Sequence, residues 1–257
     1  MTLKLHSVSA VISSDISLID IELEVEAGGV TAVIGPNGAG KTSLLRAICS
    51  DLTLSGGVIK INDKATSQWD AQSKAKLLAI LPQRSSLEFP FTVGEVVTMG
   101  RIPHSTSNSQ NRDIVNKALA LVDCNHLAAR SFINLSGGEK QRVQLARVAA
   151  QVWDAVDGGE RCLILDEPTA SLDLAHQEMV VGMFEFFAAQ GVAILVVLHD
   201  LNLAAKCANQ ILVLKDGHSA AIGTPKAVLT EAMLKEVFSI SAKVISNPVN
   251  GKPMVVT

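Results

Sequence analysis

A glycine-rich segment near the N-terminus carries the residues best suited to chemistry. Residues 35–42 read GPNGAGKT and fit the pattern G-x-x-x-x-G-K-[ST], which cradles phosphate groups. An apolar, β-branched run at 30–34 precedes the segment, and good helix formers follow it. Backbone N–H groups at such a helix start form an anion-binding nest. The predicted nucleotide-binding residues are Gly35, Pro36, Asn37, Gly38, Ala39, Gly40, Lys41, Thr42 and Ser43.

Two side chains of this loop have separate predicted tasks. Lys41 is expected to reach the β- and γ-phosphates of a nucleotide, and the hydroxyl of Thr42 to bind Mg²⁺. The alternative is a glycine-rich turn without a ligand. That alternative does not require the strand and helix predicted on either side, so we expect a phosphate site.

Two carboxylates end an apolar strand predicted at 162–165. Asp166 and Glu167 then lie at the carboxyl edge of the sheet, where open α/β sheets bind ligands. Asp166 is expected to hold Mg²⁺, directly or through water. Glu167 is expected to activate the attacking water as general base. The alternative is a polar strand end followed by a helix cap.

His199 follows the next apolar run, at 192–198. Its two ring nitrogens can bridge a phosphate oxygen and a carboxylate. A histidine at a strand end is often structural. Because this one ends a core strand in a chain with a phosphate loop, we expect it to contact the γ-phosphate.

Residues 135–139 read LSGGE and introduce a long helix predicted at 140–152. Ser136 and Glu139 fit a capping box, which starts a helix and needs no ligand. The box does not require Gly137 and Gly138, although glycine costs up to about 1 kcal/mol per helical position relative to alanine. The pair therefore indicates a backbone that another group approaches closely, at a helix start whose N–H groups suit an anion.

The elements that must position these residues alternate between strands and helices. Before the glycine loop, Ile19, Ile21, Leu23 and Val25 alternate with acidic residues, which predicts a half-buried strand with a solvated acidic face. Residues 3–8 are expected to pair with it in an antiparallel layer. Further strands are predicted at 58–61, 78–81, 210–214 and 219–222, a terminal hairpin between 243–245 and 254–256, and helices at 70–76, 174–190 and 231–238.

The segment 84–134 interrupts this alternation. Helices are predicted at 92–99 and 112–122, separated by a polar loop at 104–111. We expect a helical insertion within an α/β chain.

Composition narrows the class of protein. The chain has 257 residues, 48% of them hydrophobic, and a net charge of −3, so no basic field suggests nucleic acid. Its four cysteines form no C-x-x-C pair, which argues against a metal site or a disulfide framework. The N-terminus lacks the apolar run of a signal peptide, and the apolar run at 192–198 is too short to cross a bilayer. If the protein acts at a membrane, another subunit is expected to span it.

Together these residues resemble the ATP-binding subunit of ABC transporters along nearly the whole chain. Their order and spacing match, and LSGGE is the specific element because other P-loop families lack it. The matching segments are 35–42 (Walker A), Gln83 (Q-loop), 135–139 (signature), 163–167 (Walker B), 171–173 (D-loop) and His199 (H-switch).

The resemblance implies an α/β fold with a P-loop NTPase (RecA-like) core, an N-terminal antiparallel β-layer and an inserted helical subdomain. The whole chain, 1–257, is then a single nucleotide-binding domain. Residues 1–84 and 160–257 are expected to form the core with the β-layer. Residues 85–159 are expected to form the helical subdomain, which carries the signature motif.

The resemblance also implies a mechanism with ATP and Mg²⁺. Two copies dimerise head to tail with two ATP molecules between them. Ser136, Gly137 and Gly138 would then contact the γ-phosphate bound to the partner chain. Asp173 would communicate across the dimer. Catalysis would rest on Glu167 and His199, and the metal on Thr42, Gln83 and Asp166.

Members of this family work with transmembrane permease subunits and, indirectly, with an extracytoplasmic substrate-binding protein. Gln83 would sense the permease. The expected location is the cytoplasmic face of the bacterial inner membrane, as a peripheral subunit, with no nucleic acid as partner.

Finer features resemble the importer branch for haem, ferric siderophores and vitamin B12, and within it the haem-import ATPase. These residues touch no transported substrate, so ferric siderophore and vitamin B12 stay open as cargo. Phe89 and Phe91 have the alternative task of packing the helical insertion. The similar segments are 81–83, 89–93, 95–97, 100–101, 103–104, 152–153, 157–158, 165–170 and 172–177.

One feature departs from the family. Many members stack the adenine on an aromatic residue, often tyrosine, in the N-terminal strand region. This chain contains no tyrosine, and residues 8–12 include no aromatic side chain. Adenine is therefore expected either to pack more weakly or to pack on aliphatic side chains.

A second class of function remains open, a soluble ABC ATPase that remodels a cytosolic partner, as in iron–sulfur assembly. Fractionation with a membrane permease or with a soluble scaffold would distinguish the two. A nucleotide-gated regulator without turnover is disfavoured, because such proteins tend to lose the general base or the switch histidine. Glu167 and His199 are both present here.

Overall fold

A six-stranded sheet forms the centre of the computed structural model, which describes residues 2–13, 16–83, 87 and 89–257. Neighbouring strands are parallel except for the edge strand β10, which is antiparallel to β9. In spatial order the strands are β10 (His218–Gly223), β9 (Gln210–Lys215), β3 (Val30–Ile34), β8 (Ala193–Val197), β7 (Cys162–Asp166) and β6 (Leu78–Leu81).

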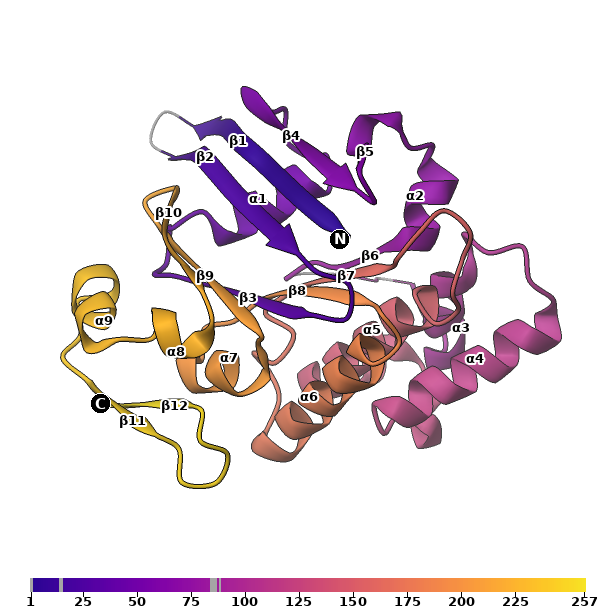
Figure 1. Cartoon of the computed structure of the whole chain (residues 1–257). Coiled ribbons are helices and arrows are strands. Elements are labelled where there is room, and N and C mark those ends of the chain that lie inside the picture. Colours follow the sequence, from indigo (N-terminus) through magenta and orange to yellow (C-terminus); the bar gives the residue numbers. More distant parts are fainter. Residues whose placement is uncertain (1, 14–15, 84–86, 88) are drawn as a thin grey trace.

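A second, antiparallel sheet lies on one face of the first, at the top of Figure 1, and the predicted β-layer is thereby confirmed. Residues of the two sheets and of helix α1 (Lys41–Ile48) share one hydrophobic cluster. The other face of the central sheet packs on helices in a larger cluster. The strands of this layer are β2 (Ile16–Val25), β1 (Leu3–Ser13), β4 (Gly56–Ile61) and β5 (Lys64–Ala65).

One residue of the predicted alternation was placed wrongly. Ile21, Leu23 and Val25 are buried as expected, but Ile19 is 42% exposed and Leu18 takes the buried position. Asp20 has a φ of +51°, and the β1–β2 register shifts at this point. Such a bulge adds a residue to one strand and turns the following side chains to the other face, which the simple alternation did not anticipate.

The predicted helical insertion contains helices α3 (Val93–Thr98), α4 (Asn108–Leu121) and α5 (Gly137–Gln151). The polar loop predicted up to residue 111 was too long, because α4 already begins at Asn108. The side chain of Ser107 caps that helix by accepting a hydrogen bond from the Gln110 N–H at 3.2 Å. The insertion also holds short 3₁₀ turns η2 (Met99–Arg101), η3 (Asn125–Leu127) and η4 (Phe132–Asn134).

The two phenylalanines before α3 behave differently. Phe91 packs against the main hydrophobic cluster, as the packing alternative predicts. Phe89 is 69% exposed and contributes little to the core. The packing alternative is therefore confirmed for one ring only. The proposed subdomain limits at residues 84/85 and 159/160 stay a prediction.

Gly100 allows η2 to pack closely against α5 within the insertion. A Cβ atom at this position would lie 2.2 Å from the Arg147 carbonyl oxygen. We expect Gly100→Ala to lower the free energy of unfolding by about 1–3 kcal/mol, because the backbone must shift to relieve the overlap. Thermal or urea unfolding measures this effect.

Gly182 in α6 (Leu174–Ala188) is the matched control. A Cβ atom there would meet no atom within 4 Å among the described residues outside its chain neighbours and the nearby backbone of α6. Gly182→Ala should therefore stabilise the chain by about 0.5–1 kcal/mol, as alanine does in a helix. Equal effects of the two substitutions would contradict the close packing at Gly100.

The remaining elements follow the central strands. The predicted terminal hairpin is confirmed as β11 (Lys243–Ser246) paired with β12 (Pro253–Val256), shown at the lower left of Figure 1. Two short helices were not predicted from the sequence, α7 (Leu201–Cys207) and α8 (Pro225–Val228). None of the helices in the described ranges is long and apolar enough to cross a membrane. The other elements are η1 (Thr66–Gln68), α2 (Ala71–Leu77) and α9 (Glu231–Phe238).

Candidate functional site

A hollow of about 230 Å³ lies at the carboxyl end of β3. It is formed by the glycine loop and the first residues of α1, together with side chains that follow β6, β7 and β8. The fold thus brings together residues that lie up to 162 positions apart in the sequence. The lining residues are Asn37, Gly38, Ala39, Gly40, Lys41, Thr42, Ser43, Gln83, Glu167 and His199.

The glycines of the loop are required by its path. Gly35 has a φ of +155°, and a Cβ atom there would lie 2.3 Å from the Leu214 carbonyl oxygen of β9. Gly40, which precedes α1, has a φ of +99°. Residues with a Cβ atom are strained at such backbone angles. The glycines of the pattern are therefore needed both for the close approach of Gly35 to β9 and for the positive φ angles.

The turn between β9 and β10 supports the loop. The N–H of Gly217 donates to the Ala39 carbonyl at 3.1 Å, and the Gly217 carbonyl accepts from the Ile19 N–H at 3.0 Å. Gly217 thereby links the glycine loop to the N-terminal β-layer. The sequence analysis missed this contribution, because Asp216-Gly217 reads only as a tight turn.

Lys41 lies inside the loop and is 7% exposed. Its ammonium group donates to the carbonyl oxygens of Gly35 and Pro36 at 2.8 and 2.9 Å. Burial lowers the pKa of Lys41, while the carboxylates of Glu167 and Asp166 act in the opposite direction. The cation is thus held at the hollow by weak neutral acceptors, which an anionic ligand can replace.

Asp166 lies behind this hollow and is 3% exposed. Its Oδ1 atom has no hydrogen-bond partner among the residues that the structure describes. The pKa of Asp166 is raised, first by burial and next by the negative charge of Glu167, whereas the Thr42 hydroxyl and Lys41 lower it. A buried carboxylate oxygen without a partner is costly unless a cation or donor compensates it, so this position suits a metal.

We expect Asp166→Asn to stabilise the nucleotide-free chain by an amount on the order of 1 kcal/mol at neutral pH, because it removes a poorly compensated buried charge. The pKa of Asp166 in the folded chain lies above its ordinary value of 3.8. In the pH interval between these two pKa values, the folded chain binds more protons than the unfolded chain. Its stability therefore falls as the pH rises through the interval. Melting curves without Mg²⁺ should show this fall in the parent and less of it in the variant.

The same substitution should weaken Mg²⁺-dependent ATP binding, since an amide oxygen replaces a carboxylate. Titration calorimetry with and without Mg²⁺ measures this loss. A variant that is less stable and binds Mg²⁺ and ATP normally would contradict the interpretation of Asp166 as an uncompensated charge.

Glu167 and His199 meet at the mouth of the hollow. His199 Nε2 lies 2.5 Å from Glu167 Oε1, and the two side chains are 47% and 15% exposed. Glu167 has a φ of +51°, and its N–H donates to the Val197 carbonyl at 3.2 Å. The carboxylate therefore faces the hollow from a fixed backbone, with an imidazole that can exchange a proton or a hydrogen bond with it.

The signature residues and Asp173 do not line this hollow. Ser136 caps α5, and the predicted capping box is confirmed, since Ser136 accepts from the Glu139 N–H and Glu139 accepts from the Ser136 N–H. The side chain of Asp173 likewise caps α6 by accepting from the His176 N–H at 2.9 Å. Within one chain Ser136 and Asp173 therefore cap helices, and the residues expected to contact a nucleotide across a dimer lie outside this hollow.

The two signature glycines differ in their surroundings. A Cβ atom at Gly138 would lie 3.1 Å from the Ser171 carbonyl, so this glycine permits contact with the segment before α6. A Cβ atom at Gly137 would meet no atom within 4 Å among the described residues outside its chain neighbours and the nearby backbone of α5. Close packing within the described part of the chain therefore explains the glycine at position 138, but it does not explain the glycine at position 137.

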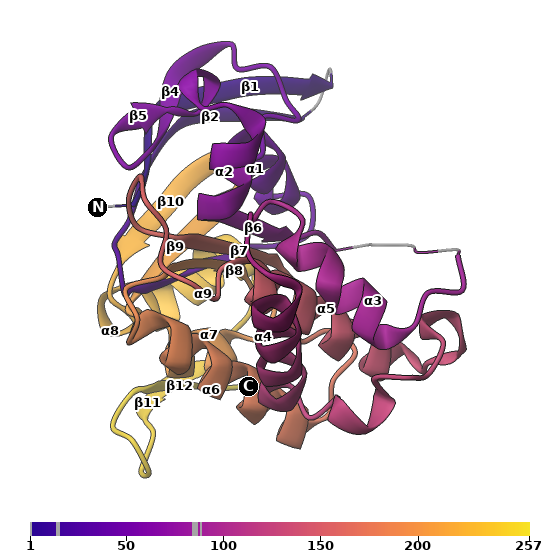
Figure 2. The same cartoon turned by 90° about the vertical axis from the view of Figure 1, so that its right-hand side faces the viewer.

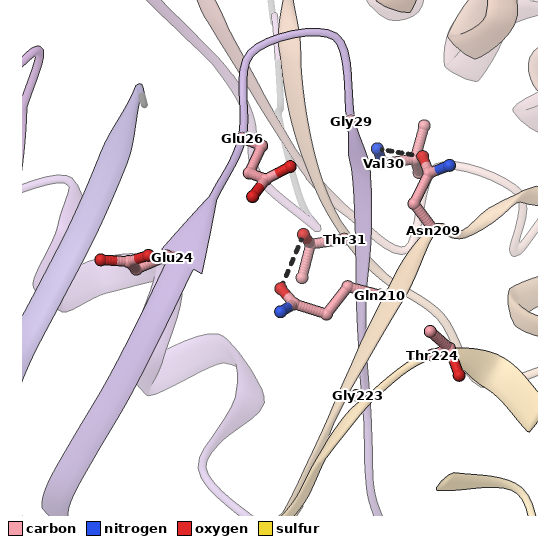
Figure 3. A pocket seen from close by; sticks show the side chains of 9 residues that line it. All are labelled: Glu24, Glu26, Gly29, Val30, Thr31, Asn209, Gln210, Gly223 and Thr224. Atoms are coloured by element: carbon pink, nitrogen blue, oxygen red, sulfur yellow. Dashed lines mark hydrogen bonds between the residues drawn. The ribbon is translucent and has the colours of Figure 1, made fainter. Parts of the chain in front are cut away.

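A second hollow, of about 280 Å³, lies at the amino end of β3, the opposite end from the glycine loop (Figure 3). Glu24 and Glu26 line it, so part of the acidic face predicted for β2 borders this space. Some of its polar groups are paired, as the Asn209 side chain accepts from the Val30 N–H at 2.8 Å and the Thr31 hydroxyl donates to Gln210 at 3.3 Å. No predicted site residue lies here, and ligands of open α/β sheets bind at the carboxyl edge instead.

An aliphatic side chain reaches the glycine loop from the N-terminal β-layer. Leu18 Cδ2 would lie 3.1 Å from a Cβ atom at Gly40. Leu18 is therefore an aliphatic side chain close enough to the glycine loop for the expected packing on adenine. The side chains of residues 12–17 lie outside the part that the structure describes, so the prediction for residues 8–12 is not tested at Ile12.

Comparison with known proteins gives concordant matches. Residues 18–170 match the family described as ABC transporter. The chain is 48% identical over 240 residues to the hemin import ATP-binding protein HmuV of Pseudomonas entomophila (strain L48), covering 93% of each chain. It superimposes with a TM-score of 0.81 on a putative metal-chelate type ABC transporter in an inward-facing conformation, at 24% identity and over 99% and 96% of the two chains. A dimeric bacterial ABC transporter cassette matches with a TM-score of 0.75 at 24% identity, over 87% and 98%.

Proposed function

Because this chain belongs to the ABC transporter family, we propose that it is the ATP-hydrolysing subunit of a bacterial importer and that the transported cargo is haem. The convergence of Lys41, Glu167 and His199 on one hollow carries the proposal of ATP hydrolysis. The haem assignment is supported by the 48% identity to a hemin import ATP-binding protein over nearly the whole chain. Ferric siderophore and vitamin B12 are the alternative cargoes.

We assign ATP to the hollow with its phosphates on the glycine loop. The N–H groups at the start of α1 and the ammonium of Lys41 supply the positive field for the β- and γ-phosphates. Thr42, Gln83 and Asp166 would hold Mg²⁺, and the unpartnered Oδ1 of Asp166 fits that task. The bound Mg²⁺ would neutralise charge on the phosphate oxygens.

Glu167 is assigned as general base in hydrolysis. Its carboxylate takes a proton from the water that attacks the γ-phosphate, and His199 holds both the carboxylate and the phosphate in place. The contact between His199 Nε2 and Glu167 Oε1 supports this pairing. A base that accepts the proton as the bond forms contributes about 10²–10⁴-fold to the rate.

The signature residues are assigned to a nucleotide bound by a second copy of the chain. One solved structure that this chain resembles is a dimeric bacterial ABC transporter cassette. Ser136, Gly137 and Gly138 lie outside the hollow of their own chain, and the open space at Gly137 supports an approaching group from a partner. Asp173 is assigned to communication across the same dimer.

Gly137→Ala tests this assignment because the added methyl group would have open space around it in the described part of its own chain, beyond its immediate helical neighbours. We expect unchanged or slightly raised thermal stability and unchanged ATP binding by the monomer. Turnover should fall by about tenfold or more, because small displacements of reacting groups are costly. Steady-state phosphate release and melting curves measure the two effects.

Gly182→Ala is again the matched control, as an exposed helical glycine with open space around it. It should leave turnover unchanged. Wild-type turnover in Gly137→Ala would show that no partner group approaches this position.

The partners beyond the second copy are proposed from the family. The permease subunits would span the membrane, an extracytoplasmic binding protein would deliver the cargo to them, and this chain would lie peripherally on the cytoplasmic face. The experiment that tests the function is an affinity pull-down of Glu167→Gln with Mg-ATP from detergent-solubilised host membranes. We expect a multispanning partner, and reconstitution with candidate cargoes then distinguishes haem from siderophore or vitamin B12.

The same experiment tests the remaining class of function. Recovery of soluble partners alone, without a membrane protein, would favour an ABC ATPase that remodels a cytosolic scaffold. That result would overturn the importer proposal while leaving ATP hydrolysis intact.

A further inference from the structure

The C-terminal hairpin β11–β12 is clamped onto the first turn of α7. The Asn202 side chain donates to the Val255 carbonyl at 3.0 Å and accepts from the Val255 N–H at 2.7 Å. Asn202 thus pairs with β12 as a neighbouring strand residue would. Val255 itself is 8% exposed and belongs to the main hydrophobic cluster. The hairpin is therefore a fixed part of the domain.

The clamp places the hairpin near the carboxyl edge of the central sheet, which is also the edge at which the nucleotide hollow lies. Helices α6 and α7 both begin where a parallel strand ends, after β7 and β8. The hairpin and the starts of these helices enclose a hollow of about 200 Å³. In Figures 1 and 2 the hairpin lies below the central sheet, beyond α7. It therefore extends the carboxyl-edge face of the molecule.

One residue that lines this hollow and one at the tip of the hairpin have large apolar side chains exposed to solvent. Leu174, the first residue of α6, is 80% exposed, and Val249 at the hairpin tip is 91% exposed. A single exposed apolar residue is ordinary. Leu174, however, directly follows Asp173, which is already assigned to the dimer. Leu174 and Val249 therefore extend the surface around Asp173, for which a second copy of the chain is the proposed partner.

The polar rim of the hollow suits a partner of the same kind. It carries both signs of charge, although Glu178 pairs with Lys206, Asp200 caps α7, and the Lys252 ammonium donates to the Lys206 carbonyl within the same chain. Amide groups also line it and can both donate and accept hydrogen bonds. An isologous contact between two identical surfaces requires this kind of self-complementarity.

We propose that Leu174 and the hairpin tip, residues 247–252, form a contact surface for a second copy of this chain. The contact is continuous with the face that holds ATP, and it rests on the proposed function because only an ATP-bound dimer brings these faces together. The hairpin would add protein–protein contact to a dimer otherwise held through nucleotide. Asn202 would act as the positioning residue that presents the tip.

The test measures the monomer–dimer equilibrium of the full chain by analytical ultracentrifugation with Mg-ATP. The parent is Glu167→Gln, which we expect to bind ATP without hydrolysing it. We expect Leu174→Ser combined with Val249→Ser to raise the dimer dissociation constant by about tenfold or more, as loss of central apolar contacts does. Asn202→Ala should weaken the dimer in the same direction, because it releases the hairpin.

Ile102→Ser is the matched control, since Ile102 is 78% exposed but lies in the helical insertion. It should leave the dissociation constant unchanged. A parent that stays monomeric with Mg-ATP would contradict the proposed ATP-sandwich dimer itself. A parent that dimerises, with the Leu174 and Val249 variant dimerising equally well, would overturn the hairpin contact alone.

Discussion

Glu167→Gln should lower the rate of ATP hydrolysis by about 10²–10⁴-fold, because glutamine cannot accept the proton of the attacking water. The substitution keeps the size of the side chain and a hydrogen-bonding group for His199, whose ring nitrogen contacts Glu167 in the parent. ATP affinity should therefore persist. Single-turnover hydrolysis and equilibrium nucleotide binding separate the two effects.

Glu185→Gln provides the matched control, since Glu185 is an exposed glutamate on α6. It should leave turnover and binding unchanged. Turnover near the parent value in Glu167→Gln would remove Glu167 from the role of general base, and a loss of ATP binding would give it a binding role instead.

Lys41→Ala should weaken ATP binding by roughly 10- to 150-fold, the effect of losing about 1.5–3 kcal/mol from a hydrogen bond to a charged group. In the structure the ammonium is already positioned in the loop by the Gly35 and Pro36 carbonyls. Its removal leaves the phosphates facing Asp166 and Glu167 with less compensating charge. Titration calorimetry with ATP measures the loss, and melting curves without nucleotide check that the chain folds.

The control for this substitution is Lys117→Ala on α4, where the lysine is exposed to solvent. Its affinity for ATP should equal that of the parent. If Lys41→Ala bound ATP as tightly as Lys117→Ala, the glycine loop would not be the phosphate site.

The phosphate loop could be predicted from the sequence because its requirements are local. Gly35 and Gly40 adopt backbone angles that favour glycine, and those angles belong to a loop of eight consecutive residues. The capping box of Ser136 and Glu139 is local for the same reason, as its two hydrogen bonds span three residues. Asp166 could be placed at the carboxyl edge because an apolar run ending in a carboxylate shows where a strand ends.

The tertiary structure decided which distant residues meet. Ile19 is exposed because a bulge at Asp20 shifts the register, and the alternation of apolar residues contains no signal for that shift. Gly217 supports the glycine loop across 178 positions, and Asn202 holds Val255 across 53. A backbone or amide hydrogen bond can form with any residue that the chain path brings near. Such partners therefore follow from the fold as a whole, whereas the residue types at the phosphate loop follow from local geometry.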